Sequence, residues 1–584
     1  MESALGPASG LGPAPATTRV AALAERLGCS RTLAGWLLAR GHVEVEPAQR
    51  FLAPRLAELT PPEPMHGRAV AAQRLARAIR GGEPIVVFGD YDCDGITATA
   101  ILTEALRTLG AKVSPLLANR FEGGYGLSSD ALEKVKALAP SVLVTCDCGS
   151  SDHASLQVLT QAGVDCIVID HHLVPEQPLP VAAFLNPHQP GCAFPYKGLA
   201  SCGLVFSVVA GIRRELNVQL DVRRWADLVA IGTIADVAPL DGDNRALVRA
   251  GLHALAQAER PGVRALLELL GISCAGPLTS RDVAFRIAPQ LNAPGRLGSP
   301  MLALELLLAK DIDVARGLAA ELAQVTATRR AQQERISDEA LAEIEAAGYA
   351  TEPAIVLGRQ GWNPGVVGIV AGRLVERFAR PVVMIGFEGE VGRGSVRGPA
   401  GSRLYDALAA TASTLVRFGG HQAAAGLELR FDNLAAFRQA FCASVVAQPQ
   451  TQLPATQGMG LELMHGDSPD RVMDDFDRLE PCGPDNPRPQ LLVRGQVLEA
   501  RSVGAGHLRL KLALPSGSLD CFGVNFGSHA KQLAGTIAVS GDLRRNTFRG
   551  VTTVELFVAT LLDQSGIELP PSSASQEVRR ESSP

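Results

Sequence analysis

Apolar runs alternate with helical stretches from residue 84 onward. The first run precedes an acidic loop and a helical stretch from Ile96 to Leu109, which Gly110 ends. Ser128 caps a second helix, and a third runs to about residue 162. The strand candidates are Ile85–Phe88, Lys112–Leu117, Ser141–Cys146 and Asp165–Ile169. This alternation predicts a mostly parallel α/β sheet.

The second half of the chain shows three further patterns. Residues 203–350 are typical of helices, and the stretch 303–347, with faces rich in Glu, Arg and Gln, predicts a long connecting helix. A second strand–helix–strand pattern spans Ala354–Leu357, Val366–Phe378 and Pro381–Ile385. From about residue 455, short strands broken by Gly, Pro and Asn predict a small β-barrel-like module.

These patterns divide the chain into six parts. The two ends, 1–18 and 566–584, are polar or rich in Pro and Gly, and we expect them to be disordered. The expected parts are an N-terminal tail with short helices (1–75), a first α/β domain (76–300), a connecting helix (301–349), a second α/β domain (350–452), a barrel domain (455–565) and a C-terminal tail (566–584).

Composition places the chain among globular proteins of a reducing compartment. Of the 584 residues, 46% are hydrophobic and 20% are charged, which excludes a mostly disordered chain. The 11 cysteines show no regular spacing and no Cys-x-x-Cys pair, so we expect free thiols. No apolar run reaches the roughly 18 residues of a membrane helix, and the first residues lack a signal-peptide pattern. We therefore expect a cytoplasmic protein with no membrane contact.

Net charge does not identify a binding partner. The 55 basic residues are balanced by 60 acidic residues, which gives a formal charge of −5. A strongly basic balance would indicate nucleic acid, and this chain does not have one. The argument for function therefore depends on motifs.

Acidic residues gather where the predicted strands end. Three acids follow the first strand, one follows the third, and an Asp-His-His triplet follows the fourth, while a further Asp closes the apolar stretch 227–235. These residues are Asp90, Asp92, Asp94, Asp147, Asp170, His171, His172 and Asp236. The carboxyl ends of parallel strands meet at one edge of a sheet, so we expect these side chains to converge in space.

Such a set of side chains is suited to metal-assisted hydrolysis of a phosphate ester. Carboxylates and imidazoles without dominant thiolates favour Mg²⁺ or Mn²⁺, and two such ions can generate hydroxide and stabilise a leaving oxygen. Each acidic segment, taken alone, also has a simpler interpretation. The Asp-x-Asp-x-Asp-Gly run resembles a calcium loop but lacks the later Glu, and a single Asp at a strand end is often a helix cap. Cys93, Cys146 and Cys148 lie in these loops, and we interpret them as packing residues.

The same residues resemble the four motifs of the DHH phosphoesterase superfamily. Further on, Gly419–Gly426 resembles the Gly-Gly-His-x-x-Ala-Ala-Gly motif of the associated DHHA1 domain. Within the superfamily the chain is most similar to the exonucleases specific for single-stranded DNA, from about residue 60 to 560. The segments that carry this similarity are 119–126, 291–296, 362–370 and 479–487. The resemblance implies a parallel-sheet DHH domain, a long helix, a DHHA1-type α/β domain and a C-terminal oligonucleotide-binding (OB) barrel.

The resemblance also implies an activity and its cofactors. It implies a 5′→3′ exonuclease that degrades single-stranded DNA to mononucleotides in repair and recombination, with two Mn²⁺ or Mg²⁺ ions. Carried over by position, the metal ligands would be Asp92, Asp94, Asp147, His171 and Asp236, with Asp147 shared between the ions. Asp90, Asp170 and His172 would support or orient them. We expect a monomer, with a single-strand-binding protein and a helicase as candidate partners.

Further residues are candidates for contacting the DNA. His421, on its turn with Gly420, would contact the scissile or an adjacent phosphate. The candidates for holding the 5′ end are Arg120, Arg296, and Ser395 and Arg397 of the Gly392–Gly398 loop, where glycines let backbone N–H groups approach phosphate. A tight hairpin with exposed arginines is the simpler interpretation of that loop. In the barrel, the stacking and backbone candidates are Phe522, Phe526, Phe548, Arg544, Arg545 and Arg549, although Phe in a barrel is more often core.

Two departures and two alternatives qualify this interpretation. Asn363 stands where the family usually has His, which removes a titratable group, and Cys482 replaces a usual Phe. The first alternative is a DHH-type phosphoesterase acting on a cyclic dinucleotide, nano-RNA or pyrophosphate; such chains are usually shorter and lack a barrel. The second is a non-enzymatic scaffold, but degenerate relatives lose the motif acids, and here all are present.

Overall fold

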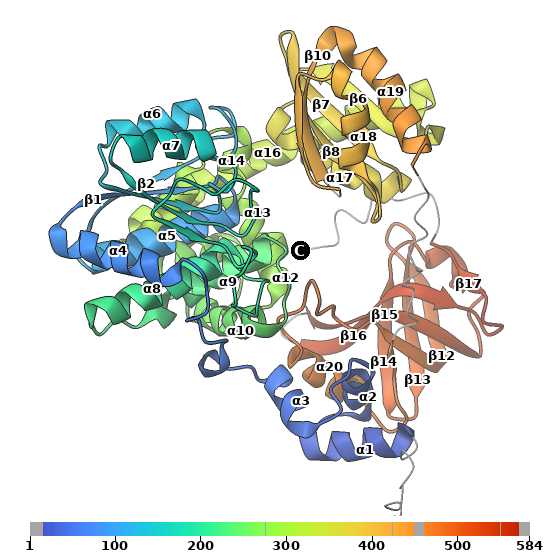
Figure 1. Ribbon diagram of the computed structural model, residues 1–584. Helices are drawn as coiled ribbons and strands as arrows, with labels where there is room; N and C mark the ends of the chain where they lie inside the picture. Colours follow the sequence, from blue (N-terminus) through green and yellow to red (C-terminus); the bar gives the residue numbers. More distant parts are fainter. Residues whose placement is uncertain (1–15, 275, 423, 449–460, 549–550, 572–584) are drawn as a thin grey trace, which may run out of the picture. The chain divides into compact units, whose positions relative to one another are not determined.

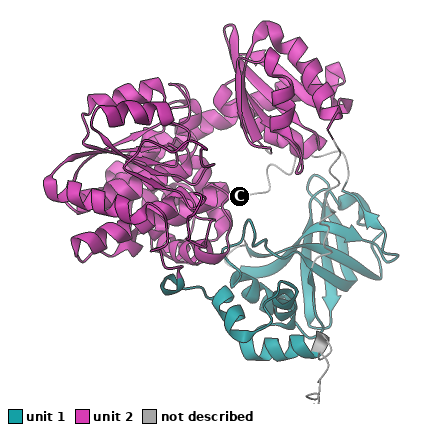
Figure 2. Cartoon of the chain, in the orientation of Figure 1, with its two compact units in different colours: residues 1–58, 457–584 teal, residues 59–456 magenta. Residues whose placement is uncertain are grey.

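The computed structural model describes residues 16–274, 276–422, 424–448, 461–548 and 551–571. The chain forms two compact units, one of residues 59–456 and the other of residues 1–58 together with 457–584 (Figures 1 and 2). The predicted disorder of residues 1–15 and 572–584 lies outside the described residues. Inside the predicted tails, Ala16 already begins a helix, and residues 568–569 form a short strand.

The larger unit begins with a five-stranded sheet in which every strand pair is parallel, in the order β2-β1-β3-β4-β5. Its strands are β1 (Pro84–Gly89), β2 (Lys112–Leu117), β3 (Val142–Cys146), β4 (Asp165–Ile169) and β5 (Ala183–Leu185). The first four agree with the predicted strands to within one residue at either end. The predicted parallel α/β sheet is therefore confirmed.

Helices cover both faces of this sheet. Alternate residues of a strand face opposite sides, so Val86 and Phe88 of β1 share one apolar cluster with helices α6 and α7. Helices α4, α5 and α8 lie on the opposite side (Figure 1). These helices are α4 (Arg68–Gly81), α5 (Cys93–Thr108), α6 (Ser129–Ala137), α7 (His153–Gln161) and α8 (Ser201–Leu216). Both faces of β1 are thereby buried, which explains its continuous apolar run.

A helical region follows the sheet, as the sequence predicts. Its helices are α9 (Ala226–Ala235), α10 (Gly242–Gln257), α11 (Pro261–Leu269), α12 (Ser280–Asp282), α13 (Ala288–Leu291), α14 (Pro294–Leu297), α15 (Met301–Leu308) and α16 (Ile312–Ala347). The single helix expected over residues 303–347 is two helices. Asp311 interrupts them, because its carboxylate accepts hydrogen bonds from the backbone N–H groups of Asp313 and Val314 and caps α16.

The second part of the larger unit is a mixed sheet in the order β6-β7-β8-β10-β9. Only the β6–β7 pair is parallel among the described strands of this sheet, and the others are antiparallel. The elements are β6 (Ile355–Gln360), α17 (Pro364–Phe378), β7 (Val382–Glu388), β8 (Val391–Arg397), α18 (Leu404–Ala410), β9 (Arg417–Gly420), β10 (Ala424–Arg430) and α19 (Leu434–Val446). Helices α17 and α19 pack in two separate apolar clusters against this sheet.

The smaller unit joins the two ends of the chain. Strands β12, β13, β14, β16 and β15 close into a barrel through the β12–β15 pairing, which confirms the predicted C-terminal barrel. Its elements are α1 (Ala16–Leu27), α2 (Arg31–Ala39), α3 (Val45–Leu52), β11 (Leu461–Glu462), α20 (Pro469–Asp477), β12 (Leu491–Val503), β13 (His507–Leu514), β14 (Gly517–Gly523), β15 (Thr536–Phe548), β16 (Val551–Leu562) and β17 (Glu568–Leu569).

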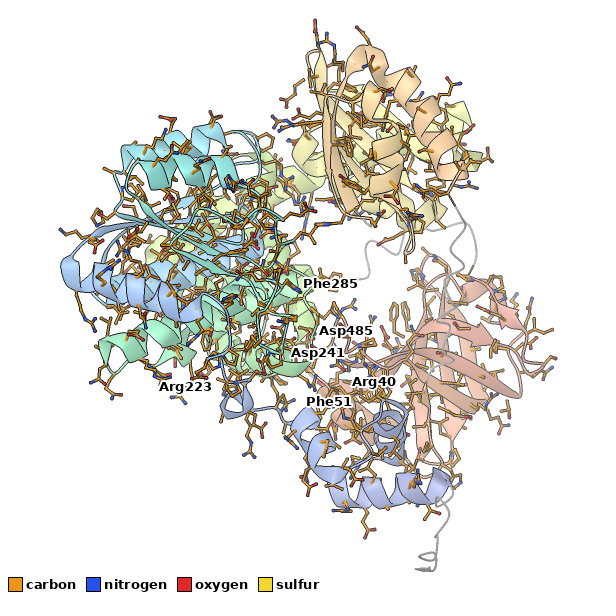
Figure 3. The ribbon with its side chains drawn as sticks, viewed as in Figure 1. Arg40, Phe51, Arg223, Asp241, Phe285 and Asp485 are labelled. Atoms are coloured by element: carbon orange, nitrogen blue, oxygen red, sulfur yellow. The ribbon has the colours of Figure 1, made fainter. Side chains whose placement is uncertain are left out.

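Helices α1 to α3 are part of the barrel unit. Their apolar residues, among them Leu33 and Leu37, share one buried cluster with barrel residues such as Phe476 and Leu510. Polar contacts reinforce this packing, and the guanidinium of Arg40 donates to the carbonyl of Asp485 over 2.6 Å (Figure 3). The N-terminal helices and the barrel therefore fold as one body, although about 400 residues separate them in sequence.

Two further expectations can be compared with the structure. All 11 cysteines are free, and seven of them are buried, in agreement with the expected free thiols. Within the described part of the chain, no helix combines the length and the apolar character that a membrane span requires.

Candidate metal centre and phosphate-binding cluster

The strand register brings three acids to one edge of the parallel sheet. Gly89 of β1 pairs with Cys146 of β3, which in turn pairs with Ile169 of β4, and the next residue in each strand is an aspartate. The ladder continues through these acids: the N–H of Asp90 donates to the carbonyl of Cys146, and that of Asp147 to Ile169. Asp90, Asp147 and Asp170 therefore lie side by side, as expected from the topology.

Two helix N-termini hold the other acids of the first motif. Asp92 caps α5, where its Oδ1 accepts hydrogen bonds from the N–H groups of Asp94 and Gly95. Asp94 is buried, and its two carboxylate oxygens accept from the N–H groups of Ser201 (2.6 Å) and Cys202 (2.9 Å), which begin α8. The partial positive charge at the start of α8 thus compensates part of the charge of a buried carboxylate.

Asp147 is the most constrained acid of the cluster. Its φ is +64°, a left-handed conformation that few non-glycine residues adopt, and its side chain is buried. The hydroxyl of Ser201 donates to its Oδ1 over 3.1 Å, and the hydroxyl of Tyr125 donates to its carbonyl over 3.1 Å. Backbone strain of this kind is commonly retained at functional sites.

His171 connects Asp147 with the acid at the end of α9. Its Nε2 lies 3.2 Å from Asp147 Oδ1 and 3.7 Å from Asp236 Oδ2. This Nε2 is buried and has no hydrogen-bond partner among the described residues, and the same is true of Oδ1 of Asp90. Buried polar atoms are normally satisfied, so these two atoms indicate a missing ligand.

Asp170 and His172 form a supporting pair. Oδ1 of Asp170 accepts from the Nδ1 of His172 over 2.7 Å and from the backbone N–H groups of both histidines. Although burial opposes both shifts, this pairing lowers the pKa of Asp170 to about 2 and raises the pKa of His172 to about 9. The Tyr125 hydroxyl lies 3.2 Å from the same Nδ1. Asp170 therefore orients the imidazole of His172, and its support of the metal ligands stays a prediction.

The cluster carries more negative charge than its surroundings compensate. Burial and the neighbouring carboxylates of Asp92 and Asp94 raise the pKa of Asp147 well above its usual range and that of Asp236 to about 8. Burial and Asp92 also raise the pKa of Asp90. Like charges held this close disfavour ionisation unless a cation binds between them.

The donor atoms fit divalent metal ions. Three groups of side chains offer ligand atoms within 4.8 Å of one another. The groups are Asp90 with Asp92 and Asp147; Asp94 with His171 and Asp236; and Asp147 with His171 and His172. Asp147 and His171 each belong to two of them, and the sharing of Asp147 between two ions stays a prediction. Carboxylate oxygens and imidazoles suit Mn²⁺ and Mg²⁺, and no cysteine belongs to these groups within the described residues.

Guanidinium groups from separate elements gather beside the acids. The guanidinium of Arg120 stacks on the ring of Tyr91 at 4.3 Å, and Tyr91 lies between two acids of the first motif. On α14, Arg296 donates from Nη1 to the carbonyl of Gly365 over 3.2 Å. Burial and the charges of Arg120, Arg329 and Arg397 lower the pKa of Arg296 to about 10, whereas Asp92 raises it.

The cluster of Arg120, Arg296, Arg329 and Arg397, called the arginine cluster below, has no acidic partner in contact. No ion pair joins any of its members to a carboxylate within the described chain. The Nε atoms of Arg120 and Arg329 are buried without a hydrogen-bond partner among those residues. A partly buried positive cluster without ion pairs is suited to binding an anion.

The segment 392–398 is not the loop that the sequence predicts. All of it except Gly398 belongs to β8, in the middle of the second sheet, because β7 and β10 pair with this strand on both sides. Its Arg393 pairs with Glu428 and also donates to the backbone carbonyl of Arg120 over 3.0 Å, so it ties the two parts of the larger unit together. Ser395 and Arg397 are partly buried on this strand.

The Gly-Gly-His segment forms the hairpin between β9 and β10. Gly420 has a φ of +131°, and a Cβ there would lie 2.6 Å from the Cα of Ala425, so this position requires glycine. His421 follows it and is exposed, with its N–H donating to the carbonyl of Ala424. The phosphate contact of His421 stays a prediction.

The barrel candidates occupy different environments. Phe522 is partly exposed, with its ring 5.8 Å from Phe557 and 5.6 Å from His507, whereas Phe526 is buried in the core. Arg545 donates to the carboxylates of Asp474 (2.6 Å) and Asp477 (2.9 Å), so its charge is already compensated. The side chain of Phe548 and all of Arg549 lie outside the described residues.

Sequence reasoning missed three residues that act on these sites: Ser201, Tyr125 and Arg329. Ser201 contacts two acids, and its only sequence signal is a run of small residues that begins α8. Tyr125 follows two glycines with positive φ, and this turn places its hydroxyl near the second acid. Arg329 belongs to a buried polar stripe with Thr326, Gln333 and Ser337 on α16, a spacing that could have been recognised.

Three segments match known domain families. Residues 84–233 match the N-terminal domain of the DHH family, residues 351–447 match the DHHA1 domain, and residues 461–560 match the RecJ OB domain. The single-stranded-DNA-specific exonuclease RecJ of Dickeya dadantii is 35% identical over 525 residues, which cover 85% of this chain and 90% of that relative. The chain belongs to the RecJ family of single-stranded-DNA-specific exonucleases.

Other RecJ proteins agree with this assignment. RecJ of Escherichia coli is 34% identical over 86% of this chain and 91% of its own length. The crystal structure of RecJ from Thermus thermophilus in complex with Mn²⁺ has a TM-score of 0.79 and 33% identity, covering 93% of this chain and 78% of that one. A second structure of the same RecJ, in complex with Mg²⁺, has a TM-score of 0.74 and 30% identity, and covers 95% of this chain and 77% of that one.

Proposed function

We propose that this protein is a metal-dependent exonuclease that degrades single-stranded DNA from its 5′ end to mononucleotides, by hydrolysis at a two-metal centre. The observation that carries the proposal is the proximity of an acidic cluster and the arginine cluster. Tyr91 is flanked by Asp90 and Asp92 and carries Arg120 on its ring, so the two clusters share one loop. Named RecJ relatives act on single-stranded DNA, and RecJ structures contain Mn²⁺ or Mg²⁺.

Five side chains would hold the ions. They are Asp92, Asp94, Asp147, His171 and Asp236, with Asp147 shared, and Asp90 lies within reach of the same site. Two divalent ions held there would supply a hydroxide at neutral pH and would stabilise the leaving oxygen of the phosphodiester. Ser201 and Asp170 help to fix these ligands, because Ser201 donates to Asp147 and Asp170 accepts from the backbone N–H of His171. The ligands are therefore held before substrate arrives.

The arginine cluster supports the 5′→3′ direction. A terminal phosphate monoester carries about two negative charges near neutral pH, more than any phosphodiester within the strand. Arginine forks bind such groups bidentately, and an uncompensated cluster favours the group with the highest charge. A 5′-terminal phosphate bound at Arg120, Arg296, Ser395 and Arg397 would leave the neighbouring phosphodiester at the metal centre. Each cut would then release one mononucleotide.

The barrel supplies a second surface for the strand. The rings of His507, Phe522 and Phe557 follow one another, and the guanidinium of Arg544 lies 4.2 Å over the ring of Phe557. Partly exposed aromatic rings next to an arginine are a platform on which bases stack without sequence preference. Phe522 keeps its proposed role there. Arg545 is paired with two acids and Arg544 with one, Asp542, so Arg544, which also lies over an aromatic ring, is the better placed cation.

Three broader expectations stay proposals. We propose that the protein acts in DNA repair and recombination in the cytoplasm, as a monomer, with a single-strand-binding protein and a helicase as candidate partners. The free cysteines are compatible with a reducing compartment.

The test uses single-stranded DNA labelled at either end. The purified protein is incubated with Mn²⁺ or Mg²⁺ beside an Asp147→Ala variant and beside blunt duplex DNA. We expect early release of labelled mononucleotide from the 5′ label, and none from the variant or the duplex. Early release from the 3′ label would contradict the direction. Turnover of dinucleotides or pyrophosphate without DNA cleavage would favour the small-substrate phosphoesterase instead.

A further inference from the structure

Helix α17 makes unusually close contacts with the residues of the arginine cluster. Gly365 lies in its first turn, and a Cβ there would be 2.1 Å from the carbonyl oxygen of Arg296. The same Arg296 donates from Nη1 to the carbonyl of Gly365. The backbone of α14 and the start of α17 are therefore in direct contact, which only glycine permits.

One turn further along, the helix meets the two candidates from β8. A Cβ at Gly368 would be 2.9 Å from Oγ and 3.3 Å from Cβ of Ser395, and 3.6 Å from Nη2 of Arg397. Gly368 has ordinary helical backbone. Glycine therefore matters at this position because it has no side chain, and not because of its conformation. The hydroxyl of Ser395 and the tip of Arg397 thus lie against bare helix backbone.

The start of this helix is fixed by a cap. Oδ1 of Asn363 accepts from the N–H of Gly365 over 2.8 Å. The side-chain oxygen of asparagine is a good N-cap acceptor, so Asn363 fixes the first turn of α17. The three ligand candidates, Arg296, Ser395 and Arg397, are therefore arranged along the first two turns of one anchored helix.

This arrangement is unfavourable without an anion. Guanidinium groups repel one another, and the N-terminal end of a helix carries partial positive charge that adds to the repulsion. Free side chains would separate to reduce it. Gly368 leaves the space in which Ser395 and Arg397 lie beside the helix, since a Cβ at this position would be 2.9 Å from Oγ of Ser395 and 3.6 Å from Nη2 of Arg397.

We propose that Gly368 is a specificity-determining position: by lacking a side chain, it keeps the Ser395 hydroxyl and the Arg397 guanidinium in place to bind a 5′-terminal phosphate. The role is one of positioning, since Gly368 acts through Ser395 and Arg397. The inference rests on the proposed function and names the feature of the strand end that the site recognises.

The helix offers a matched control for the test. Gly372 lies one turn beyond Gly368 on α17, and a Cβ there would meet no atom within 4 Å. Gly368→Ala and Gly372→Ala are therefore the same substitution on the same helix. The added methyl group meets Ser395 at position 368 and no atom at position 372. Gly372→Ala removes a glycine from a helix interior without a collision, so it should not lower the thermal midpoint of the full-length protein, and the same measurement on Gly368→Ala checks that this variant is folded.

The measurement compares kcat/KM on single-stranded DNA that ends in a 5′-phosphate or a 5′-hydroxyl, with Mn²⁺ present. We expect Gly368→Ala to lower kcat/KM for the phosphorylated strand by about tenfold or more, mainly through KM, because charge-assisted hydrogen bonds to the phosphate are weakened. The ratio between the two substrates should fall toward one. Gly372→Ala should keep the wild-type ratio.

A double-mutant cycle shows whether the effect passes through Ser395. Ser395→Ala should lower the same ratio, and adding Gly368→Ala should change it by much less than Gly368→Ala does alone. An unchanged ratio in Gly368→Ala, a full additive loss in the double variant, or an equal fall in Gly372→Ala would overturn the inference. If wild-type protein does not cut either strand from its 5′ end, the proposed function itself fails, and this inference fails with it.

Discussion

Ser201 donates its hydroxyl to Oδ1 of Asp147 over 3.1 Å, while its backbone N–H donates to Asp94 over 2.6 Å. One residue at the start of α8 therefore orients two of the expected metal ligands. We predict that Ser201→Ala lowers the apparent affinity for Mn²⁺ by about 10- to 100-fold, as the loss of an outer-sphere partner commonly does. Titration of exonuclease activity with Mn²⁺ measures the effect.

A matched control is Thr103→Val on α5. Its hydroxyl is also buried but has no hydrogen-bond partner among the described residues, so its removal should leave the Mn²⁺ titration unchanged. An equal shift in both variants would mean that the change acts through general packing and not through the contact of Ser201 with Asp147.

Metal binding should stabilise the larger unit. Burial and neighbouring acids raise the pKa values of Asp90, Asp147 and Asp236, so ionisation of these carboxyls is disfavoured until a cation binds. We predict that Mn²⁺ at about 100 times its Kd adds about 2.7 kcal/mol to the free energy of unfolding of protein stripped with EDTA. Asp147→Asn should lose most of this gain, and calorimetry with and without metal measures it. A full gain in the variant would contradict a shared ligand at this position.

The ring of Tyr91 should hold Arg120 in position for the substrate. Their stacking at 4.3 Å is a cation–π contact, worth about 0.5 to 2 kcal/mol. We predict that Tyr91→Leu raises KM for 5′-phosphorylated DNA by about 2- to 30-fold. Arg438 over Tyr349, at 4.7 Å, offers a control pair in the same unit. Tyr349→Leu should leave KM unchanged, and equal effects in the two variants would argue against a positioning role.

Stability should fall in acid because of Glu104. Although burial opposes the shift, Arg260 and Lys310 lower the pKa of Glu104 to about 2. A carboxyl with a depressed pKa stabilises the fold above its unfolded value of about 4.5, and this contribution disappears as the pH falls toward 2. From the size of the shift, we expect about 3 kcal/mol at pH 7.

The corresponding measurement is urea unfolding of wild type and Glu104→Gln between pH 7 and pH 2. The difference in unfolding free energy should be largest above pH 4.5 and should shrink below it. Glu305→Gln, an exposed carboxylate on α15, should differ little from wild type at any pH. A difference between wild type and Glu104→Gln that grows as the pH falls would contradict this sign.

Asp475 should link the N-terminal helices to the barrel. Its buried carboxylate accepts from the N–H of Ser30 over 2.6 Å. We predict that Asp475→Ala lowers the stability of this unit by about 1 to 3 kcal/mol, since it leaves a buried donor unpaired. Asp470→Ala removes an exposed acid from the same helix and should cost much less. Thermal unfolding of the full chain compares them, and equal losses would contradict a linking role.

Local patterns account for the parts of the fold that sequence could predict. The apolar runs at β1 to β4 are buried on both faces, so their sequence signal is continuous, and the acids after them follow from parallel topology. The helix break at Asp311 depends on a side-chain cap and could have been recognised from Asp311 itself. The assignment of residues 392–398 to a loop was wrong because its glycines suggested a turn, whereas β8 is a central strand whose glycines admit close neighbours such as Phe387.

Other features depend on tertiary contacts that no local pattern contains. Nothing near Ser201 indicates that its hydroxyl meets Asp147, which lies 54 residues away. Nothing near Arg545 indicates that two acids of α20 compensate its charge. The packing of α1 to α3 against the barrel also could not be predicted from local sequence, because it depends on apolar contacts between segments about 400 residues apart.

That union has a consequence for synthesis of the protein. A ribosome adding about 5 to 20 residues per second needs roughly 20 to 80 seconds to make the stretch of about 400 residues between α3 and the barrel. During this time the apolar faces of α1 to α3 have been translated but their partner has not. The nascent chain therefore carries these apolar faces without their partner until the barrel, the last part of the chain to be made, has been translated.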